Sequence, residues 1–124
     1  ALFNAWNMAR EAAQRLLLIG RAAPPAWAIA LPDLRTRLAT AGVIAIAPPD
    51  EQVAAQLIGH GLTARGAAFA PDMPDFVARR ITRCYAVIDA VTASLNADSL
   101  ASGRKLSVAR AREVLGARKL LAEE

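Results

Sequence analysis

The sequence has very few cysteine, histidine and aromatic residues. Its 124 residues include one cysteine, Cys84, and one histidine, His60. A single thiol excludes a disulfide within the chain and fits a reducing cytosol. A single histidine with no cysteine near it cannot supply the three or four ligands that a zinc ion takes from a protein. Aromatic residues make up only 5% of the chain, so we expect a hydrophobic core built from aliphatic side chains.

Long hydrophobic runs are also missing, since no run approaches the roughly 20 residues that span a bilayer. The start carries no signal-peptide pattern, and we expect a cytoplasmic protein. Hydrophobic residues still make up 55% of the chain, and many of them are alanine, a strong helix former. The net charge of +4 is compatible with an anionic partner such as nucleic acid but does not require one.

The first 47 residues alternate between helical and strand-like patterns. A helical spacing of apolar residues runs to about residue 14. The apolar run 16–19 follows and is closed by Gly20, as in a strand buried on both faces. A helical turn over 32–41 then leads into a second apolar run, 43–47. This order is typical of an α/β domain.

The remaining residues, 48–124, predict about four helices. Their expected start signals are Asp50, Asp72, the region of Cys84, and Ser107; Gly66 and Gly103 are stop signals. The expected inward-facing side chains include Val53, Leu57, Ile58, Leu62, Phe76, Val77, Ile81, Tyr85, Ile88, Val91, Leu95, Val108, Ala111, Val114, Leu115 and Leu121. We therefore expect a mostly α protein with a small α/β part, divided into residues 1–47 and 48–124.

Two arginines, Arg35 and Arg37, lie in the helical turn 32–41 after Pro32 and Asp33. Residues two apart on a helix point in different directions, so both cannot lie on the buried side. A fixed, outward guanidinium is what stabilises charge on a transferring phosphoryl group. The alternative for Arg37 is an i,i+4 ion pair with Asp33 on its own helix, worth about 0.2–0.5 kcal/mol.

The order and spacing of these segments resemble the last part of a DnaA-type AAA+ ATPase module, and most closely the Hda branch of regulatory DnaA homologues. The resemblance covers nearly the whole chain. It rests on Leu16-Leu17-Leu18-Ile19-Gly20, Pro24-Pro25, Leu31-Pro32-Asp33-Leu34-Arg35-Thr36-Arg37-Leu38, Pro49-Asp50-Glu51, Phe76-Val77-Ala78-Arg79-Arg80-Ile81, Ser99-Leu100-Ala101-Ser102-Gly103-Arg104-Lys105-Leu106-Ser107 and Arg112-Glu113-Val114-Leu115.

The resemblance implies two parallel strands and a helical lid, and it makes Arg37 the arginine finger that acts in trans. Arg35 and Asp33 become its neighbours at the subunit interface. The implied partners are DnaA, the DNA polymerase sliding clamp through an upstream motif, and a possible second copy; DNA is involved indirectly. The implied cofactor is ADP or ATP with Mg²⁺ in the complete protein, and none is expected on this chain alone. The implied location is bacterial and nucleoid-associated.

The sequence also departs from the family. It has no Gly-x-x-x-x-Gly-Lys-Ser/Thr loop, so we expect the ATP site to lie upstream of Ala1. Ile19-Gly20-Arg21-Ala22 stands at the strand end where the family often carries a polar or acidic sensor, so Arg21 is one candidate for nucleotide contact. Ala86 stands where the family carries its second sensor arginine, and Arg83, expected one helical turn earlier on nearly the same face, is the other candidate. The absence of the phosphate-binding loop and of the family's sensor residues favours an activator of a partner's ATPase over a self-sufficient ATPase. The chain ends without room for a helix-turn-helix domain, which favours Hda over DnaA.

Two other functions stay open at this point, a DnaA-like initiator ATPase and a non-catalytic, basic DNA-associated module. The strand pattern raises a further question, because the family's two strands, 16–19 and 43–47, flank a strand that this sequence does not contain. Unpaired backbone groups are costly when buried. We therefore expect one of three outcomes: the missing part exists elsewhere, the two strands pair with each other, or a second copy fills the gap.

Overall fold

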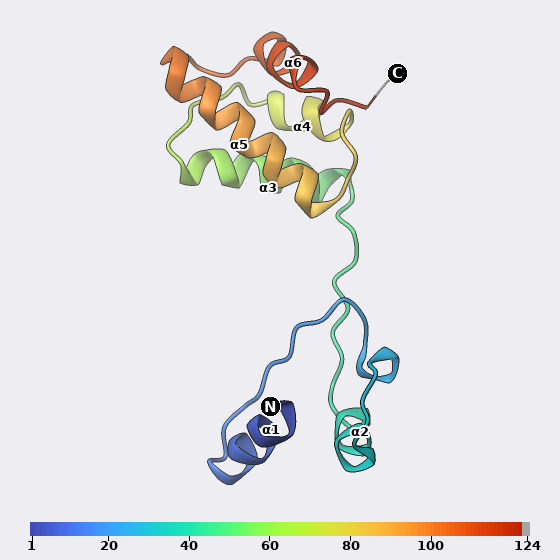
Figure 1. Cartoon of the computed structure of the whole chain (residues 1–124). Helices are drawn as coiled ribbons and strands as arrows, with labels where there is room; N and C mark the ends of the chain where they lie inside the picture. The colour runs from blue at the N-terminus through green and yellow to red at the C-terminus, as the bar shows by residue number, and fades with distance from the viewer. Residues whose placement is uncertain (123–124) are drawn as a thin grey trace. The chain divides into compact units, whose positions relative to one another are not determined.

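Six α-helices and one short 3₁₀ helix form over residues 1–122, the part that the computed structural model describes (Figure 1). They divide between two compact units, Ala1–Ala45 and Ile46–Glu124. The first unit contains α1 (Leu2–Glu11), the 3₁₀ helix η1 (Pro24–Ala26) and α2 (Pro32–Ala39); the second contains α3 (Glu51–Ala64), α4 (Met73–Ala78), α5 (Tyr85–Ser102) and α6 (Val108–Ala117). The chain is mostly helical, as predicted.

The second unit is a four-helix arrangement around one aliphatic core. Helix α3 packs against α4 and α5, and α6 packs against α4 and α5. Each fully buried leucine or valine contributes about 1.5–3 kcal/mol by leaving water. The core side chains are Ala54, Ala55, Ile58, Leu62, Met73, Val77, Ala78, Ile81, Ile88, Val91, Leu95, Leu106, Ala111 and Leu115.

Capping geometry confirms the predicted helix starts at Asp50 and Ser107, whereas the Asp72 side chain makes no capping hydrogen bond at the start of α4. The Asp50 carboxylate accepts a hydrogen bond from the Val53 N–H at 2.8 Å, and the Ser107 hydroxyl accepts one from the Arg110 N–H at 3.1 Å. Each such cap stabilises a helix by about 1 kcal/mol. Gly66 and Gly103 follow α3 and α5 with φ of +75° and +63°, a conformation that glycine adopts without strain.

The predicted buried face of α3 is partly wrong. Val53 and Leu57 are 38% and 36% exposed, whereas Ala54 and Ala55 are buried with Ile58 and Leu62. The small alanines form the packed face because they let the neighbouring helices approach closely. Tyr85 is likewise 46% exposed rather than inward, and its hydroxyl donates to the Ala47 carbonyl at 3.1 Å.

The two predicted strands are not formed. Residues 16–19 and 43–47 have no regular secondary structure and do not pair with each other. Leu17, Ile19, Ile44 and Ile46 are 80–92% exposed. A strand needs a neighbour to satisfy its backbone N–H and C=O groups, and the described residues supply none. Among residues 1–122, the one β-bridge lies in the second unit and joins Phe69 and Leu106.

Gly61→Ala is expected to destabilise the second unit because α3 and α5 approach closely at Gly61. A Cβ there would lie 2.7 Å from the Thr92 Cγ2. Thr92 is buried and its hydroxyl donates to the Ile88 carbonyl at 2.8 Å, so its side chain cannot turn away without losing that bond. We expect a loss of about 1–3 kcal/mol, the range for overpacking, measured by urea denaturation.

Gly116→Ala is the matched control, since Gly116 also lies within a helix but a Cβ there meets nothing within 4 Å. This variant should gain about 0.5–1 kcal/mol from the better helix propensity of alanine. Equal changes in the free energy of unfolding for the two variants would contradict the close approach of α3 and α5 at Gly61.

Candidate functional site

Arg37 lies in the last turn of α2, on a helix whose orientation is fixed by two buried leucines. Pro32 occupies the first turn, where its missing N–H costs nothing. Leu34 and Leu38 are 6% and 1% exposed. With that face buried, the Arg37 guanidinium lies beside Asp33, one turn earlier, with Nη2 3.0 Å from Oδ2. The intrahelical ion pair that the i,i+4 spacing allows is therefore formed.

Arg37 also connects α2 to α1. Its Nη1 donates to the Asn7 Oδ1 at 2.8 Å, and its guanidinium carbon lies 5.4 Å from the centre of the Phe3 ring. The Arg37 side chain remains 26% exposed. Because a guanidinium carries more N–H donors than these contacts use, it can still donate to an anion from this fixed position.

Arg35 points to a different part of the first unit. Its Nη2 donates to the Ile29 carbonyl at 2.7 Å, and the side chain is at the surface. The pair Arg35 and Arg37 therefore diverges, as the two-residue spacing predicts, and each guanidinium is held by a different segment. Asp33 is 64% exposed and pairs with Arg37.

The two candidates for nucleotide contact differ in their surroundings. Arg21 lies in the bend after Gly20, is exposed, and has no hydrogen bond or ion pair among residues 1–122. Arg83 lies in the second unit, with its Nη1 3.8 Å from the Glu51 Oε2. The helix predicted to carry Arg83 begins only at Tyr85, so the interpretation that places Arg83 on one helical face with Ala86 is wrong.

Neither His60 nor Cys84 belongs to a metal site in the part of the chain that the structure describes. No group of three or more His, Cys, Asp or Glu side chains gathers there. His60 is exposed on α3, and Cys84 is partly exposed at the start of α5. Trp27 anchors the loop before α2: its indole N–H donates to the Ala22 carbonyl at 2.7 Å, and its ring lies against Gly20.

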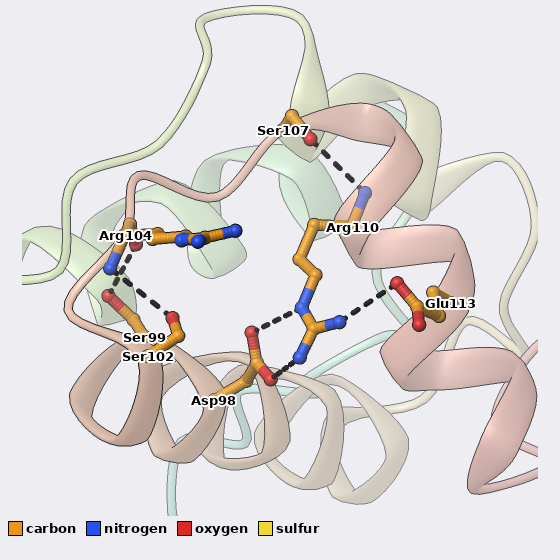
Figure 2. A network of polar contacts seen from close by, with 7 residues as sticks. All are labelled: Asp98, Ser99, Ser102, Arg104, Ser107, Arg110 and Glu113. Carbon is orange, nitrogen blue, oxygen red and sulfur yellow. Dashed lines mark hydrogen bonds and ion pairs between the residues drawn. The ribbon is translucent and has the colours of Figure 1, made fainter.

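Sequence reasoning missed an ionic cluster between α5 and α6 (Figure 2). The Arg110 guanidinium donates to both carboxylate oxygens of Asp98, at 2.9 and 2.5 Å, and to the Glu113 Oε2 at 2.8 Å. The hydrogen bonds from Arg110 lower the pKa of Asp98 below its ordinary value of 3.8. The carboxylates of Asp98 and Glu113 in turn raise the pKa of Arg110. The i,i+3 spacing of Arg110 and Glu113 was a usable signal, but nothing local marks Asp98.

Asp98→Asn is expected to destabilise the second unit more at pH 7 than at low pH. A carboxylate with a lowered pKa stabilises the fold above its ordinary pKa, and that contribution is lost as the pH falls through the lowered value. The difference in urea midpoint between wild type and variant should therefore shrink between about pH 5 and pH 2.

Asp89→Asn provides the control for this pH dependence, since Asp89 is 81% exposed and its ion-pair partner Arg65 lies 4.0 Å away. Exposed pairs of this kind contribute about 0–1 kcal/mol. A pH-independent effect of Asp98→Asn would contradict the assignment of the lowered pKa to the Arg110 contact.

Over residues 1–122, no helix combines the length and the apolar character needed to cross a membrane. No protein-family model matches the chain. No solved structure matches it either.

Proposed function

We propose that the chain is the C-terminal part of a DnaA-type AAA+ module, resembling Hda, that acts as a negative regulator of replication initiation. In this proposal Arg37 acts in trans on ATP bound to DnaA and promotes its hydrolysis. The sequence segments quoted above support the family, and the geometry around Arg37 supports the residue.

The observation that carries the proposal is the fixed position of the Arg37 guanidinium. Asp33 and Asn7 each hold one terminal nitrogen, and the side chain keeps 26% of its surface exposed. An arginine that stabilises transferring phosphoryl charge must be oriented before its ligand arrives, because ordering a flexible side chain costs conformational entropy. Asp33 and Asn7 provide that orientation.

The two units take different roles in this proposal. The four helices of the second unit form the lid of the AAA+ module. Residues 16–19 of the first unit and residues 43–47, which run from the first unit into the second, become parallel strands when an apolar strand lies between them. Their exposed Leu17, Ile19, Ile44 and Ile46 side chains are then buried, and their backbone groups are paired.

The chain's own chemical contribution is the positive charge of Arg37. An arginine supplied by a neighbour accelerates phosphoryl transfer by about 10³–10⁵-fold where it completes the site. In the complete protein, a nucleotide with Mg²⁺ would be held by residues outside this chain, and the sliding clamp would be contacted outside it too. The protein then serves mainly as an activator of its partner's ATPase.

A hydrolysis assay tests the proposal. The protein that carries this chain is mixed with ATP-bound DnaA and a DNA-loaded sliding clamp, and conversion of the bound ATP to ADP is followed. We expect faster conversion only when all components are present. Conversion at the rate of DnaA alone would overturn the proposed function.

A further inference from the structure

Helix α1 presents two side chains to Arg37, one turn apart on the same face. Phe3 and Asn7 are spaced i,i+4, so both lie on the same side of the helix. The Asn7 Oδ1 accepts a hydrogen bond from the Arg37 Nη1 at 2.8 Å, and the Arg37 guanidinium carbon lies over the Phe3 ring, 5.4 Å from its centre. Both side chains are half-buried. One face of α1 therefore contacts one cation at two points.

The contact with Phe3 differs in kind from the contacts with Asn7 and Asp33. A hydrogen bond or an ion pair takes up an N–H at the edge of the guanidinium. An aromatic ring attracts a cation through the negative charge of its face and takes up no donor. Phe3 can therefore hold the Arg37 guanidinium in place and leave its remaining N–H groups to an anion.

The three contacts act on different atoms of the guanidinium. Asn7 holds Nη1, Asp33 holds Nη2 at 3.0 Å, and the central carbon lies over the Phe3 ring. Contacts at the two terminal nitrogens leave the planar group able to tilt about the line that joins them. A ring beside the central carbon limits that tilt. Phe3 thus restricts a motion that Asn7 and Asp33 leave open.

Core packing does not account for the place of Phe3. No side chain of α1 is buried, and the buried side chains of the first unit, Leu34 and Leu38, belong to α2. Phe3 therefore fills no closed core. Within residues 1–122, the one cation that lies over its ring is Arg37. The ring therefore acts on the orientation of Arg37 rather than on a hydrophobic core.

We propose that Phe3 is a positioning residue for Arg37, which fixes the tilt of the guanidinium while its N–H groups stay available to a phosphoryl group. This inference rests on the proposed function, because only there does Arg37 act on a phosphate. A cation–π contact at the protein surface favours the arrangement that makes it by a factor of about 2–5. We expect a factor of that size in the rate of stimulated hydrolysis.

The first test measures hydrolysis of DnaA-bound ATP against the concentration of the protein that carries this chain. Phe3→Leu removes the ring but keeps an apolar side chain. We expect the rate at saturation to fall by about 2–5-fold with the half-saturating concentration unchanged, because Phe3 acts through Arg37. A mere loss of folded protein would raise the half-saturating concentration and leave the saturated rate as it was. That second pattern would overturn the proposal.

Two further variants serve as rescue and control. Phe3→Tyr keeps an aromatic ring at this position and should stimulate hydrolysis as the wild type does. Trp6→Leu removes another half-buried aromatic side chain of α1, whose indole makes no hydrogen bond and no cation–π contact among residues 1–122. This variant should leave the saturated rate unchanged. An equal loss of rate in the Trp6 variant, or a loss in the tyrosine variant, would contradict the role of the Phe3 ring.

An NMR measurement on the full chain tests the contact without any partner. Protons over the face of an aromatic ring resonate upfield, so the Arg37 Nε–H signal should lie upfield in the wild type, in Phe3→Tyr and in Trp6→Leu. It should return to the ordinary position of arginine signals in Phe3→Leu, and an unchanged signal in that variant would overturn the positioning role. A signal that moves as expected in a protein that does not stimulate hydrolysis would overturn the proposed function alone and support the positioning of Arg37 by Phe3.

Discussion

Under the proposed function, replacing Arg37 by alanine is expected to lower the stimulated hydrolysis of DnaA-bound ATP by about 10³-fold or more, the contribution of an arginine supplied in trans. The variant lacks the guanidinium that is proposed to reach the phosphate, and Arg35 is not placed to replace it, because its side chain donates to the Ile29 carbonyl. The measurement is the single-turnover rate of ATP conversion in the presence of the DNA-loaded clamp.

Arg35→Ala is the matched control for this prediction. It removes a guanidinium from the same helix and only one hydrogen bond, to a carbonyl at the surface, which contributes about 0.5–1.5 kcal/mol. We expect the hydrolysis rate to change by less than about tenfold. A larger loss in the Arg35 variant than in the Arg37 variant would contradict the assignment of the finger.

Replacing Leu95 by alanine is expected to destabilise the second unit by about 2–5 kcal/mol, the range for leucine deletions in a core. Leu95 is fully buried in the core cluster, on the helix that packs against both α3 and α6. Because domains are stable by only about 5–15 kcal/mol, this loss is a large share of the total. Urea denaturation, followed by circular dichroism, measures it.

Leu100→Ala gives the control on the same helix. Leu100 is 74% exposed, so its truncation leaves no cavity and should change the free energy of unfolding by less than about 0.5 kcal/mol. Similar losses of unfolding free energy in the Leu95 and Leu100 variants would mean that α5 does not present the described face to the core.

The helices of the second unit were predictable because their ends are encoded locally. Asp50 and Ser107 accept hydrogen bonds from N–H groups three residues on, and Gly103 takes a positive φ. Each signal acts within one turn of its own helix and does not depend on the rest of the fold. The exposed Val53 could not be predicted in this way, because which face of α3 is buried depends on the helices packed against it.

The prediction of two strands was wrong because strand formation is not decided locally. An apolar run such as 16–19 identifies a segment suited to a sheet, but a strand forms only when a second segment pairs with it. Pairing depends on residues distant in sequence, and none of the described residues provides them. The runs 16–19 and 43–47 have no regular secondary structure, and most of their side chains are exposed.

The candidate site was predictable only in part. The Asp33 and Arg37 ion pair follows from their i,i+4 spacing. The contact between Arg37 and Asn7 spans 30 residues and has no local signal. The same holds for the Asp98 and Arg110 pair, since it joins two helices. Contacts within one helix follow from periodicity, whereas contacts between elements require the fold.

The most direct test of the central claim compares two variants that separate the chemistry of Arg37 from its tethering of α1. Arg37→Lys keeps the positive charge beside Asp33 but loses the planar fork that binds two phosphate oxygens. Asn7→Ala keeps the guanidinium and removes its hydrogen bond to α1.

We predict that Arg37→Lys loses most of the stimulated hydrolysis of DnaA-bound ATP, whereas Asn7→Ala retains it within about tenfold. An active lysine variant together with an inactive Asn7 variant would show that Arg37 serves only to hold α1 against α2, and would contradict its role as the arginine finger.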